Sequence, residues 1–411
     1  MGDGTLVRKN ESTKTYSIRK GMGVEAVEFD ASQVVLVSEE LLGAIPLQTY
    51  GWVDVNADGK ADYCRLVGTQ NFVDSRIACT LSTGTGFGST FTSAVLDWGY
   101  AEGRAWVDVN DDDKADYCRL VGNAGQYSLL CTLSTGTGFS GQLMSSIIDP
   151  GYDSGRAWVD VSADGKADYC RLVGGQNMVS SYVQCTPSTG IGFGNTFTSA
   201  LLDWGQDSGR AWVDVNNDRK ADFCRVVKNA GQSFVQCTLS TGTGFSGSMM
   251  SPAIDPGYDT GRTWADVSAD GQADYCRFVG GQNMVNSYVQ CTLSTGTGFG
   301  STFTSDVLDW GYDSGRAWVD VNEDAKADFC RVVGNAPLGA VQCTLSTGTT
   351  FSGSLTSSSL DWGYFEGRTW ADINNDRKAD YCRMVGNPGA YKMSCALSTG
   401  TGFAGELSTN L

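Results

Sequence analysis

The sequence predicts an all-β protein folded as a seven-bladed β-propeller of four-stranded blades. The main evidence is a repeat, because a segment like Trp-Val-Asp-Val-Asn-Asp-Asp-Asp-Lys-Ala-Asp-Tyr-Cys-Arg occurs seven times, starting near Trp52, Trp106, Trp158, Trp212, Trp264, Trp318 and Trp370. Each repeat of about 50 residues has short apolar stretches between Gly-rich turns, and no long segment has the 3.6-residue apolar period of a helix. Such repeats are typical of propeller blades. Neither end reads as the polar cap of an open solenoid, so we expect a closed ring.

Each repeat is expected to contain four strands in a fixed order. Residues 104–109 have apolar side chains at alternate positions and form a first strand, which an Asp/Asn loop joins to a second strand at residues 115–121. A variable turn leads to a third strand, as at residues 181–186. A Ser-Thr-Gly-Thr-Gly-Phe turn introduces the fourth, as at residues 90–96.

The N-terminal residues are expected to close the ring. Residues 42–52 align with residues 96–106, and the chain reaches Leu411 inside the fourth strand of the seventh repeat. Residues 26–50 can therefore supply the missing outer strand of the last blade and hide its edge. This interpretation gives a tail at residues 1–25 and one propeller at residues 26–411. The alternative is that the N-terminal segment is a separate leader or prosegment.

The composition excludes several classes of function. Histidine is absent, which excludes Ser-His-Asp and Cys-His catalysis and histidine-ligated zinc. The chain has 29 Lys and Arg against 46 Asp and Glu, so its net charge of −17 disfavours nucleic-acid partners. No apolar stretch approaches the roughly 20 residues that span a bilayer, so we expect no membrane insertion. Almost every carboxylate belongs to the repeats, whereas an active site is usually unique. The sequence therefore predicts that the protein is not an enzyme and has no catalytic residues.

The 14 cysteines fall two to each repeat, on the second and third strands. Opposed side chains in a hairpin come within disulfide range, so we expect seven disulfides inside the blades. Buried free thiols are the alternative. Disulfides imply an oxidising compartment, and we expect an extracellular or secreted protein. No signal peptide is visible at residues 1–9, so either the signal has been removed or export is unconventional. The expected pairs are 64/79, 118/131, 170/185, 224/237, 276/291, 330/343 and 382/395.

The Asp/Asn loop of each repeat predicts a calcium site. It places oxygen side chains at loop positions 1, 3, 5 and 9, and calcium takes six to eight oxygen ligands. An Asp-rich turn that only caps a hairpin is the alternative. We expect up to seven structural calcium ions, bound by Asp54, Asn56, Asp58, Asp62, Asp108, Asn110, Asp112, Asp116, Asp160, Ser162, Asp164, Asp168, Asp214, Asn216, Asp218, Asp222, Asp266, Ser268, Asp270, Asp274, Asp320, Asn322, Asp324, Asp328, Asp372, Asn374, Asp376 and Asp380.

The seven loops are not equal. Position 6 favours Gly if the backbone is left-handed there, and only three loops have Gly at that position. A non-Gly residue in this conformation costs about 1–2 kcal/mol. We therefore expect weak or empty sites at Arg219 and Arg377.

These loops and the segments between repeats resemble two groups of known proteins. The loop Asp-x-Asn-x-Asp-x-x-x-Asp resembles the FG-GAP-type calcium-binding propeller repeats of integrin α subunits and many secreted proteins. The run Gly-Tyr-x-x-Gly-Arg-x-Trp before it is similar to fungal seven-bladed propeller lectins of the Psathyrella velutina lectin type. The Cys pairs and the Arg after each second-strand Cys depart from those lectins. The resemblance implies a calcium-containing propeller that binds sugars, and it does not identify the sugar.

The segments between repeats offer candidate carbohydrate sites. Sugars pack on aromatic faces and pair their hydroxyls with planar polar groups. Tryptophans just before the loops are expected to pack between blades, whereas Trp98 and its counterparts suit binding or packing equally. The Arg after each second-strand Cys could reach a ligand, but we expect it to pair with a loop Asp. The candidate binding residues are Asp97, Trp98, Tyr100, Arg104, Tyr152, Arg156, Trp204, Arg210, Tyr258, Arg262, Trp310, Tyr312, Arg316, Trp362, Tyr364 and Arg368.

The sequence therefore favours a calcium-dependent, multivalent carbohydrate-binding protein with repeated shallow sites between blades. Its expected partners are glycans or glycoproteins. The alternative function is an integrin-like adhesion or scaffold propeller that binds a protein partner, for which one differentiated face is expected. Nearly identical repeats favour the first function, because they present the same small site several times.

Overall fold

The protein is described by a computed structural model that covers residues 4–10, 15–20, 26–30, 50–68, 74–123, 125–175, 181–281, 286–335, 338–387 and 390–410. The chain divides into two compact units, Met1–Pro46 and Leu47–Leu411. The first unit contains a three-stranded antiparallel sheet in the order β1-β2-β3, formed by β1 (Gly4–Asn10), β2 (Thr15–Lys20) and β3 (Ala26–Asp30).

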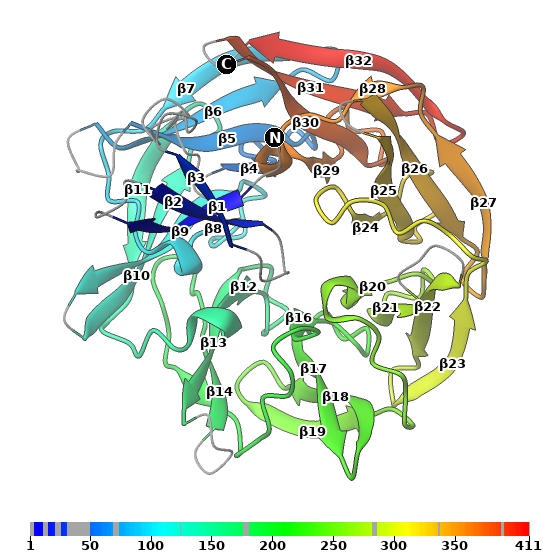
Figure 1. The fold of residues 1–411 in the computed structure, drawn as a ribbon. Helices are drawn as coiled ribbons and strands as arrows, with labels where there is room; N and C mark the ends of the chain where they lie inside the picture. Colours follow the sequence, from blue (N-terminus) through cyan, green and yellow to red (C-terminus); the bar gives the residue numbers. More distant parts are fainter. Residues whose placement is uncertain are drawn as a thin grey trace. The chain divides into compact units, whose positions relative to one another are not determined.

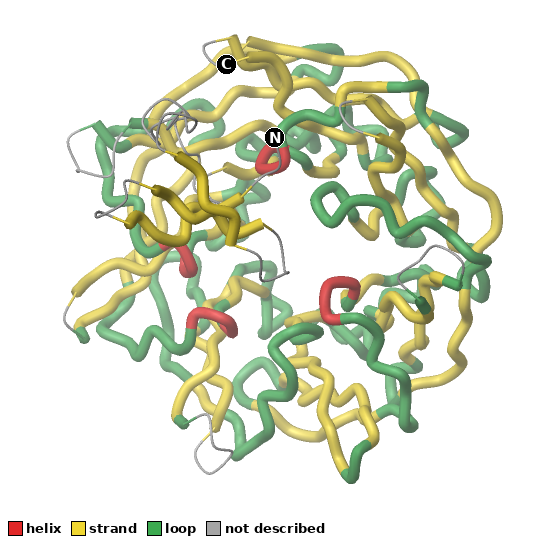
Figure 2. Tube along the Cα trace, in the orientation of Figure 1, coloured by secondary structure: helices red, strands yellow, loops and turns green. Residues whose placement is uncertain are grey.

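The second unit is the predicted seven-bladed propeller. Figure 1 shows its antiparallel sheets arranged around a centre, and Figure 2 shows that strands and loops dominate it. The first strand of each blade lies nearest the centre. These inner strands are β4 (Tyr50–Val53), β8 (Ala105–Val107), β12 (Ala157–Val159), β16 (Ala211–Val213), β20 (Thr263–Ala265), β24 (Ala317–Val319) and β29 (Thr369–Ala371).

The other three strands follow outward in chain order. The second strands are β5 (Asp62–Val67), β9 (Asp116–Asn123), β13 (Asp168–Gly174), β17 (Asp222–Asn229), β21 (Asp274–Gly280), β25 (Asp328–Asn335) and β30 (Asp380–Asn387). The third strands are β6 (Arg76–Ser82), β10 (Gln126–Ser134), β14 (Ser181–Thr186), β18 (Gln232–Ser240), β22 (Ser287–Ser294), β26 (Leu338–Ser346) and β31 (Ala390–Ser398). The outer strands are β7 (Phe87–Thr92), β11 (Phe139–Met144), β15 (Phe197–Thr198), β19 (Phe245–Met250), β23 (Phe299–Thr304), β27 (Phe351–Thr356) and β32 (Phe403–Asn410).

The connections between blades contain little regular structure. A short strand β28 (Leu360–Asp361) pairs with β26. In the described part of the chain, four single-turn 3-10 helices precede inner strands: η1 (Ala101–Gly103), η2 (Asp153–Gly155), η3 (Asp259–Gly261) and η4 (Phe365–Gly367). No helix in the described part of the chain has the length and apolar character of a membrane span.

Ring closure by the N-terminal segment is not confirmed. The outer strand of blade seven is β32, which pairs with β31 from Lys392↔Asn410 to Ser398↔Phe403. Strand β3, the start of the expected closing segment, pairs with β2 instead, and residues 31–49 lie outside the described residues. Strand β32 has the Phe-x-Gly start of outer strands such as β27 and is two residues longer, with 8 residues against 6.

Hydrogen bonds join each blade to the preceding one. A Ser at the end of the third strand donates its hydroxyl to a backbone carbonyl of the previous blade, as from Ser134 to Val55 at 2.6 Å. Ser82 makes the equivalent bond to Ile373 at 2.5 Å, which connects blade one to blade seven. The backbone N–H of Ala61 also donates to Asp372 O at 2.7 Å across this boundary. Blade five differs, because the hydroxyl of Ser294 donates to Ala273 O within its own blade.

Apolar cores lie inside and between the blades. In blade one the buried residues include Val55, Leu66 and Ile77, and Trp106 and Phe139 of blade two pack against them. This contact confirms the expected interblade packing for Trp106. It also explains the apolar positions of the repeat, because each blade covers the core of its neighbour.

All seven predicted disulfides form, and each joins residues that are register partners on the second and third strands. The paired Cα atoms are 4.0–4.1 Å apart. Because such bonds persist in oxidising compartments, they indicate an oxidising, extracellular environment.

Candidate functional site

The segments that enter the blades have one repeated turn. The carboxylate of Asp203 accepts the N–H of Gly205 at 2.8 Å, and Gly205 has a φ of +67°. A Cβ on Gly205 would lie 2.5 Å from Val226 O, so only glycine allows the segment to approach the next blade. The same carboxylate-to-glycine bond occurs at Asp97, Asp149, Asp255, Asp309 and Asp361.

The predicted arginines hold these turns together. The guanidinium of Arg210 donates to Trp204 O at 2.7 Å and to Gly205 O at 2.9 Å, and it pairs with Asp207 at 2.7 Å. Carbonyls of the equivalent turn also accept from Arg104, Arg156, Arg262, Arg316 and Arg368. Most of the donor capacity of these side chains is therefore used inside the protein.

The loop tryptophans are packed rather than exposed. Trp98, Trp204 and Trp362 are 8%, 7% and 4% exposed. Trp310 is half-buried and stacks on Phe278, with ring centroids 4.9 Å apart. These rings close the space between blades and offer little of their faces to a sugar.

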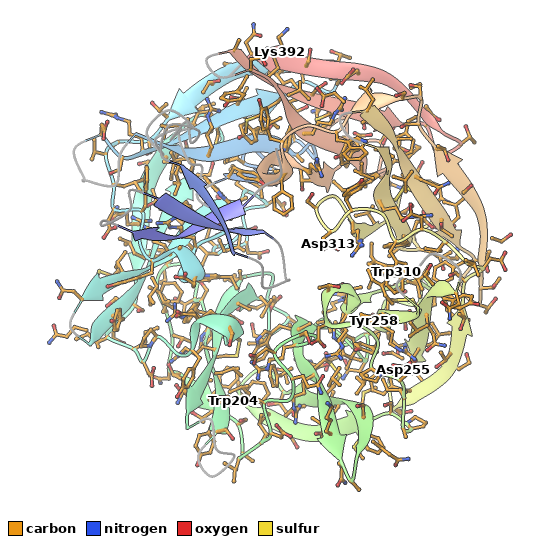
Figure 3. All side chains as sticks on the ribbon, in the orientation of Figure 1. Trp204, Asp255, Tyr258, Trp310, Asp313 and Lys392 are labelled. Atoms are coloured by element: carbon orange, nitrogen blue, oxygen red, sulfur yellow. A yellow bond between two sulfur atoms is a disulfide. The ribbon has the colours of Figure 1, made fainter. Side chains whose placement is uncertain are left out.

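The tyrosines of the same segments present the accessible aromatic surface. Tyr100, Tyr152, Tyr312 and Tyr364 are exposed, and Tyr258 is half-buried. The hydroxyl of Tyr152 donates to Gly174 O at 2.7 Å, which fixes the ring while part of it stays accessible. Most of these rings pack against an aromatic side chain of the following blade. Tyr258 packs against Trp310 in this way, with ring centroids 5.2 Å apart (Figure 3).

The structure brings several predicted residues together between blades three and four. Tyr152, Asp203, Trp204 and Arg210 line a half-open cleft of about 270 Å³, with Ser154, Ser181, Gly205 and Asp207. The Tyr152 and Trp204 rings meet edge to face at 5.0 Å. The Asp207 side chain is 82% exposed although its carboxylate pairs with Arg210. The cleft thus combines an accessible aromatic ring with a carboxylate and hydroxyls.

The Asp loops form a second repeated feature. In the first loop, Asp54 accepts the N–H groups of Asn56 and Asp58 at 3.2 Å and that of Gly59 at 2.6 Å. Positions 4 and 6 are left-handed in every loop, for example with φ of 62° at Ala57 and 66° at Arg219. The expected left-handed position 6 is therefore observed, and the sequence did not reveal the second one at position 4.

The position-9 aspartates are fully buried. Asp62 accepts the N–H of Val55 at 3.2 Å and that of Ser82 at 2.7 Å, so it ties the loop to the third strand. Burial raises the pKa of Asp62 to about 7. The same cause raises the pKa of Asp116, Asp168, Asp222, Asp274, Asp328 and Asp380 to about 7.

These loops, as placed, do not fit a closed calcium cage. Within the described residues no three His, Cys, Asp or Glu side chains are grouped so that they could hold a metal ion. Asp58 instead faces the Lys60 ammonium at 3.0 Å, and the other aspartates accept backbone amides. The observation in favour of a cation is Asn110, whose buried Oδ1 has no hydrogen-bond partner among the described residues. Calcium binding at the loops stays a prediction.

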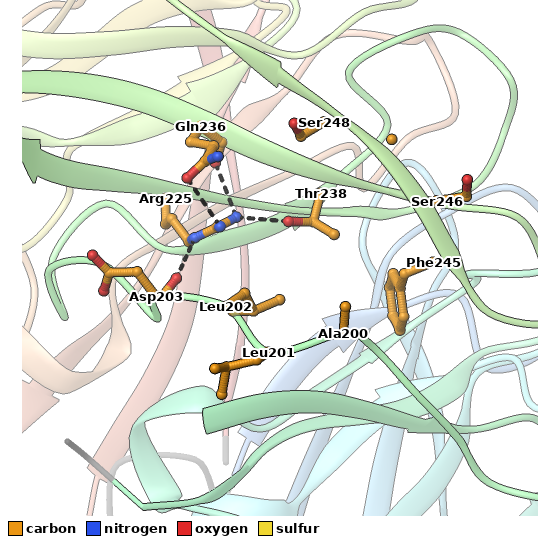
Figure 4. A pocket seen from close by; sticks show the side chains of 11 residues that line it. Ala200, Leu201, Leu202, Asp203, Arg225, Gln236, Thr238, Phe245, Ser246 and Ser248 are labelled. Atoms are coloured by element: carbon orange, nitrogen blue, oxygen red, sulfur yellow. Dashed lines mark hydrogen bonds between the residues drawn. The ribbon is translucent and has the colours of Figure 1, made fainter. Parts of the chain in front are cut away.

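The arginines that follow the second-strand cysteines were placed wrongly by the sequence. They were expected to pair with loop aspartates. Arg225 instead donates to Thr238 Oγ1 at 2.9 Å, to Gln236 Oε1 at 3.1 Å and to Asp203 O at 2.5 Å, on the floor of another cleft (Figure 4). The signal that could have found this cleft is the alternation of strand positions, which puts Arg225 on the same face as Gln236 and Thr238.

Comparisons with known proteins give one curated relative and several distant structures. No protein-family model matches the sequence. The NAD(+)--arginine ADP-ribosyltransferase Chelt of Vibrio cholerae is 26% identical over 306 residues, which cover 73% of this chain and 47% of the relative. The chain thus spans about half the length of that relative. The Dos1 propeller is 11% identical, with a TM-score of 0.35, over 100% of this chain and 92% of that chain. The V. cholerae biofilm matrix protein Bap1 is 9% identical, with a TM-score of 0.20, over 89% and 83%.

One sequence-based prediction is corrected by these comparisons. The sequence predicted that the chain is not an enzyme, but the curated relative is named as an enzyme. The lack of histidine and the seven-fold repetition of the carboxylates are therefore not sufficient to exclude an enzyme.

Proposed function

We propose that this propeller is a multivalent carbohydrate-binding protein whose sites are the clefts between blades. The coarser conclusion is that its fold fits a binding or scaffold role. The observation that carries the finer proposal is the cleft between blades three and four, which has an accessible Tyr152 ring beside the exposed carboxylate of Asp207.

The chemistry of this cleft suits a sugar ring. The C–H face of a pyranose packs on an aromatic ring, and carboxylates accept hydrogen bonds from sugar hydroxyls. Tyr152 would provide the first contact, and Asp207 and Ser154 the second. The tryptophans and arginines of the predicted set act here by positioning, because they fix the turn on which Tyr152 and Asp207 lie.

The repetition of the tyrosine supports multivalency. The same exposed or half-buried ring recurs at Tyr100, Tyr258, Tyr312 and Tyr364, whereas Gln206 replaces it at one blade entry. Shallow sites of this size bind a monosaccharide weakly, but several sites on one ring bind a glycosylated surface tightly through avidity.

A glycan screen tests the proposal. The full chain is applied to a glycan array with calcium and again with EDTA, because calcium-dependent binding is a prediction of the loop sequences. Retention on a defined set of glycans supports the proposal. Absence of binding to every glycan, or equal binding to a glycoprotein and its deglycosylated form, contradicts it; the second result favours the adhesion or scaffold alternative.

The chain offers a matched pair of variants for this screen. Tyr152→Gln creates at one entry the residue that the chain already has at Gln206, so the fold should tolerate it. We expect weaker retention of the same glycans. Gln206→Tyr adds a ring at the reciprocal position, and we expect stronger retention. Unchanged retention of both variants would show that the tyrosines are not the contact surface.

A second candidate function rests on the curated relative alone. Its name describes transfer of ADP-ribose from NAD+ to arginine, and we propose this activity as a candidate for the present chain. The test incubates the chain with labelled NAD+ and agmatine, a small guanidine acceptor. Label on agmatine above a protein-free control supports the activity, and label at the control level contradicts it.

A further inference from the structure

Six buried arginines recur in successive blades, and each guanidinium lies 5.1–5.8 Å from the centroid of a Tyr or Phe ring. Arg119, Arg171, Arg225, Arg277, Arg331 and Arg383 are each only 1–2% exposed. Among the described residues, Glu406 at Arg383 provides the one carboxylate within ion-pair distance of any of the six. A buried charge without a counter-charge is costly, so the remaining guanidinium groups suggest a ligand that supplies one.

Blade seven shows how a carboxylate fits this position. The Glu406 carboxylate accepts hydrogen bonds from Arg383 Nη2 and from the Ser394 hydroxyl. Register places Ser394 opposite Arg383, and Glu406 opposite Ala396. In blade four the same three positions hold Gln236, Thr238 and Ser248. Compared with blade four, blade seven has Ser and Ala in place of Gln and Thr, and Glu in place of Ser. The two smaller residues leave room for the Glu406 carboxylate to reach the guanidinium.

Clefts lie at this place in blades four, six and seven, and the cleft of blade seven, about 780 Å³, is lined by both Arg383 and Glu406. In blade four, Arg225, Gln236, Thr238 and Ser248 line a cleft of about 510 Å³ (Figure 4). In blade six, Arg331 lies at the corresponding place in a cleft of about 450 Å³.

The arginines of these two clefts keep donor capacity for a ligand. Nη2 of Arg225 has one described acceptor, Gln236 Oε1, for its two N–H groups. Nη2 of Arg331 likewise has Gln342 Oε1 at 2.8 Å, and its buried Nε has no hydrogen-bond partner in the described structure. Burial lowers the pKa of both arginines to about 10, so they stay charged at neutral pH.

We infer that the clefts of blades four and six bind the carboxylate of an acidic sugar through Arg225 and Arg331, and that Glu406 occupies the equivalent place in blade seven. The inference rests on the proposed function in that the ligand is a glycan. An arginine fork matches a planar carboxylate, and the Ser248 hydroxyl, which stands at the position of Glu406, also lines the cleft of blade four. Clefts of this volume accept one or two sugar rings, and each is lined by three Ser or Thr residues.

Nearby acidic residues should give the two clefts different affinities for an acidic sugar. Asp203 lines the cleft of blade four, but its carboxylate accepts Gly205 N–H and its carbonyl accepts Arg225 Nε. Asp306 and Asp309 both line the cleft of blade six. We therefore expect the tighter site in blade four.

The test compares two probes that differ in one carboxylate. Methyl β-glucuronide and methyl β-glucoside are titrated into the full chain by calorimetry in about 0.15 M salt, which screens the net charge of −17 beyond roughly 8 Å. We expect the glucuronide to bind about tenfold more tightly, which corresponds to one charge-assisted hydrogen bond. We also expect its binding to saturate at two molecules per chain.

Reciprocal variants test the assignment to these clefts. The triple variant Gln236→Ser, Thr238→Ala, Ser248→Glu installs the residues of blade seven in blade four, and the stoichiometry should fall to one. The reverse variant Ser394→Gln, Ala396→Thr, Glu406→Ser removes the acid from the cleft of blade seven, and the stoichiometry should rise to three. A misfolded variant can lose a site but cannot gain one, so the gain in the reverse variant is the decisive result.

Each failure has a distinct meaning. Equal affinity for the two probes, or a stoichiometry that neither variant changes, overturns the inference and leaves the proposed function standing if neutral glycans still bind on the array. Absence of binding to any glycan overturns both. An acidic peptide that displaces the glucuronide at equal concentration overturns the assignment to sugars.

Discussion

The hydroxyl of Ser82 is predicted to hold the ring closed. It donates to Ile373 O at 2.5 Å and accepts the N–H of Gly84 at 3.3 Å, and it joins residues 291 positions apart in the chain. Ser82→Ala removes both bonds and leaves the buried Ile373 carbonyl without this partner. An unsatisfied buried acceptor costs about 1–3 kcal/mol, so we expect the free energy of unfolding to fall by that amount. Opening between blades seven and one should become roughly 5- to 150-fold more frequent.

Urea denaturation followed by tryptophan fluorescence, with the disulfides intact, measures the loss of stability. Hydrogen exchange of the Ala61 N–H, which donates to Asp372 O across the same boundary, measures the opening. Ser398→Ala is the matched control, because Ser398 donates to Val321 at 2.6 Å between blades that are consecutive in the chain. We expect it to lose similar stability without faster exchange at Ala61. A change below about 0.5 kcal/mol for Ser82→Ala would refute the reasoning.

Three further predictions concern the loops and disulfides. Arg219→Gly relieves a left-handed residue with φ of 66°, so the free energy of unfolding should rise by about 0.5–1 kcal/mol in urea titrations; a loss of stability would contradict it. Replacing Cys330 and Cys343 together by Ser opens a loop with a sequence separation of 13, and should lower the stability by about 2–4 kcal/mol in the same assay; unchanged stability would show that the bond is dispensable. Because burial raises the pKa of Asp222 and its six counterparts to about 7, their stabilising effect is full below the ordinary value of 3.8 and is lost as the pH rises to about 7. In EDTA the contribution of Asp222 to the free energy of unfolding should therefore fall between pH 4 and pH 7, and comparison with Asp222→Asn isolates this contribution. Calcium binding to the loops would abolish this dependence on pH.

The sequence predicted the blades well because the relevant signals are local. The period of the Trp-Val-Asp-Val segment fixes the number of repeats, and strand alternation fixes the partners of each Cys. Cys330 and Cys343 follow directly, since a hairpin with a sequence separation of 13 places them opposite each other. The turn glycine Gly205 is explained by the same local geometry, because it takes a left-handed φ against the next blade.

The sequence was less informative about side chains that can contact more than one neighbour in space. Trp204 reads as either a binding or a packing residue, and it is buried because Tyr152 of the preceding blade entry covers it. Arg225 has loop aspartates nearby in sequence, but the pleat directs it toward the third strand. Closure of blade seven by the N-terminal segment is not confirmed, because β32 pairs with β31 as an outer strand and this pairing cannot be inferred from the repeat alone.

The hydroxyl of Ser294 distinguishes one boundary of the ring from the others. It bonds to Ala273 within blade five, whereas Ser240 and Ser346 reach back to Val161 and Val267 of the preceding blades. The boundary between blades four and five is therefore held by one fewer side-chain bond of this kind among the described contacts. Other side chains cross the same boundary, because Arg262 donates to Gln206 Oε1 at 2.6 Å and Asn217 donates to Asp270 O at 3.0 Å. The bond that Ser294 does not make is thus offset locally, and this joint inside the continuous chain is held by different contacts from those of its neighbours.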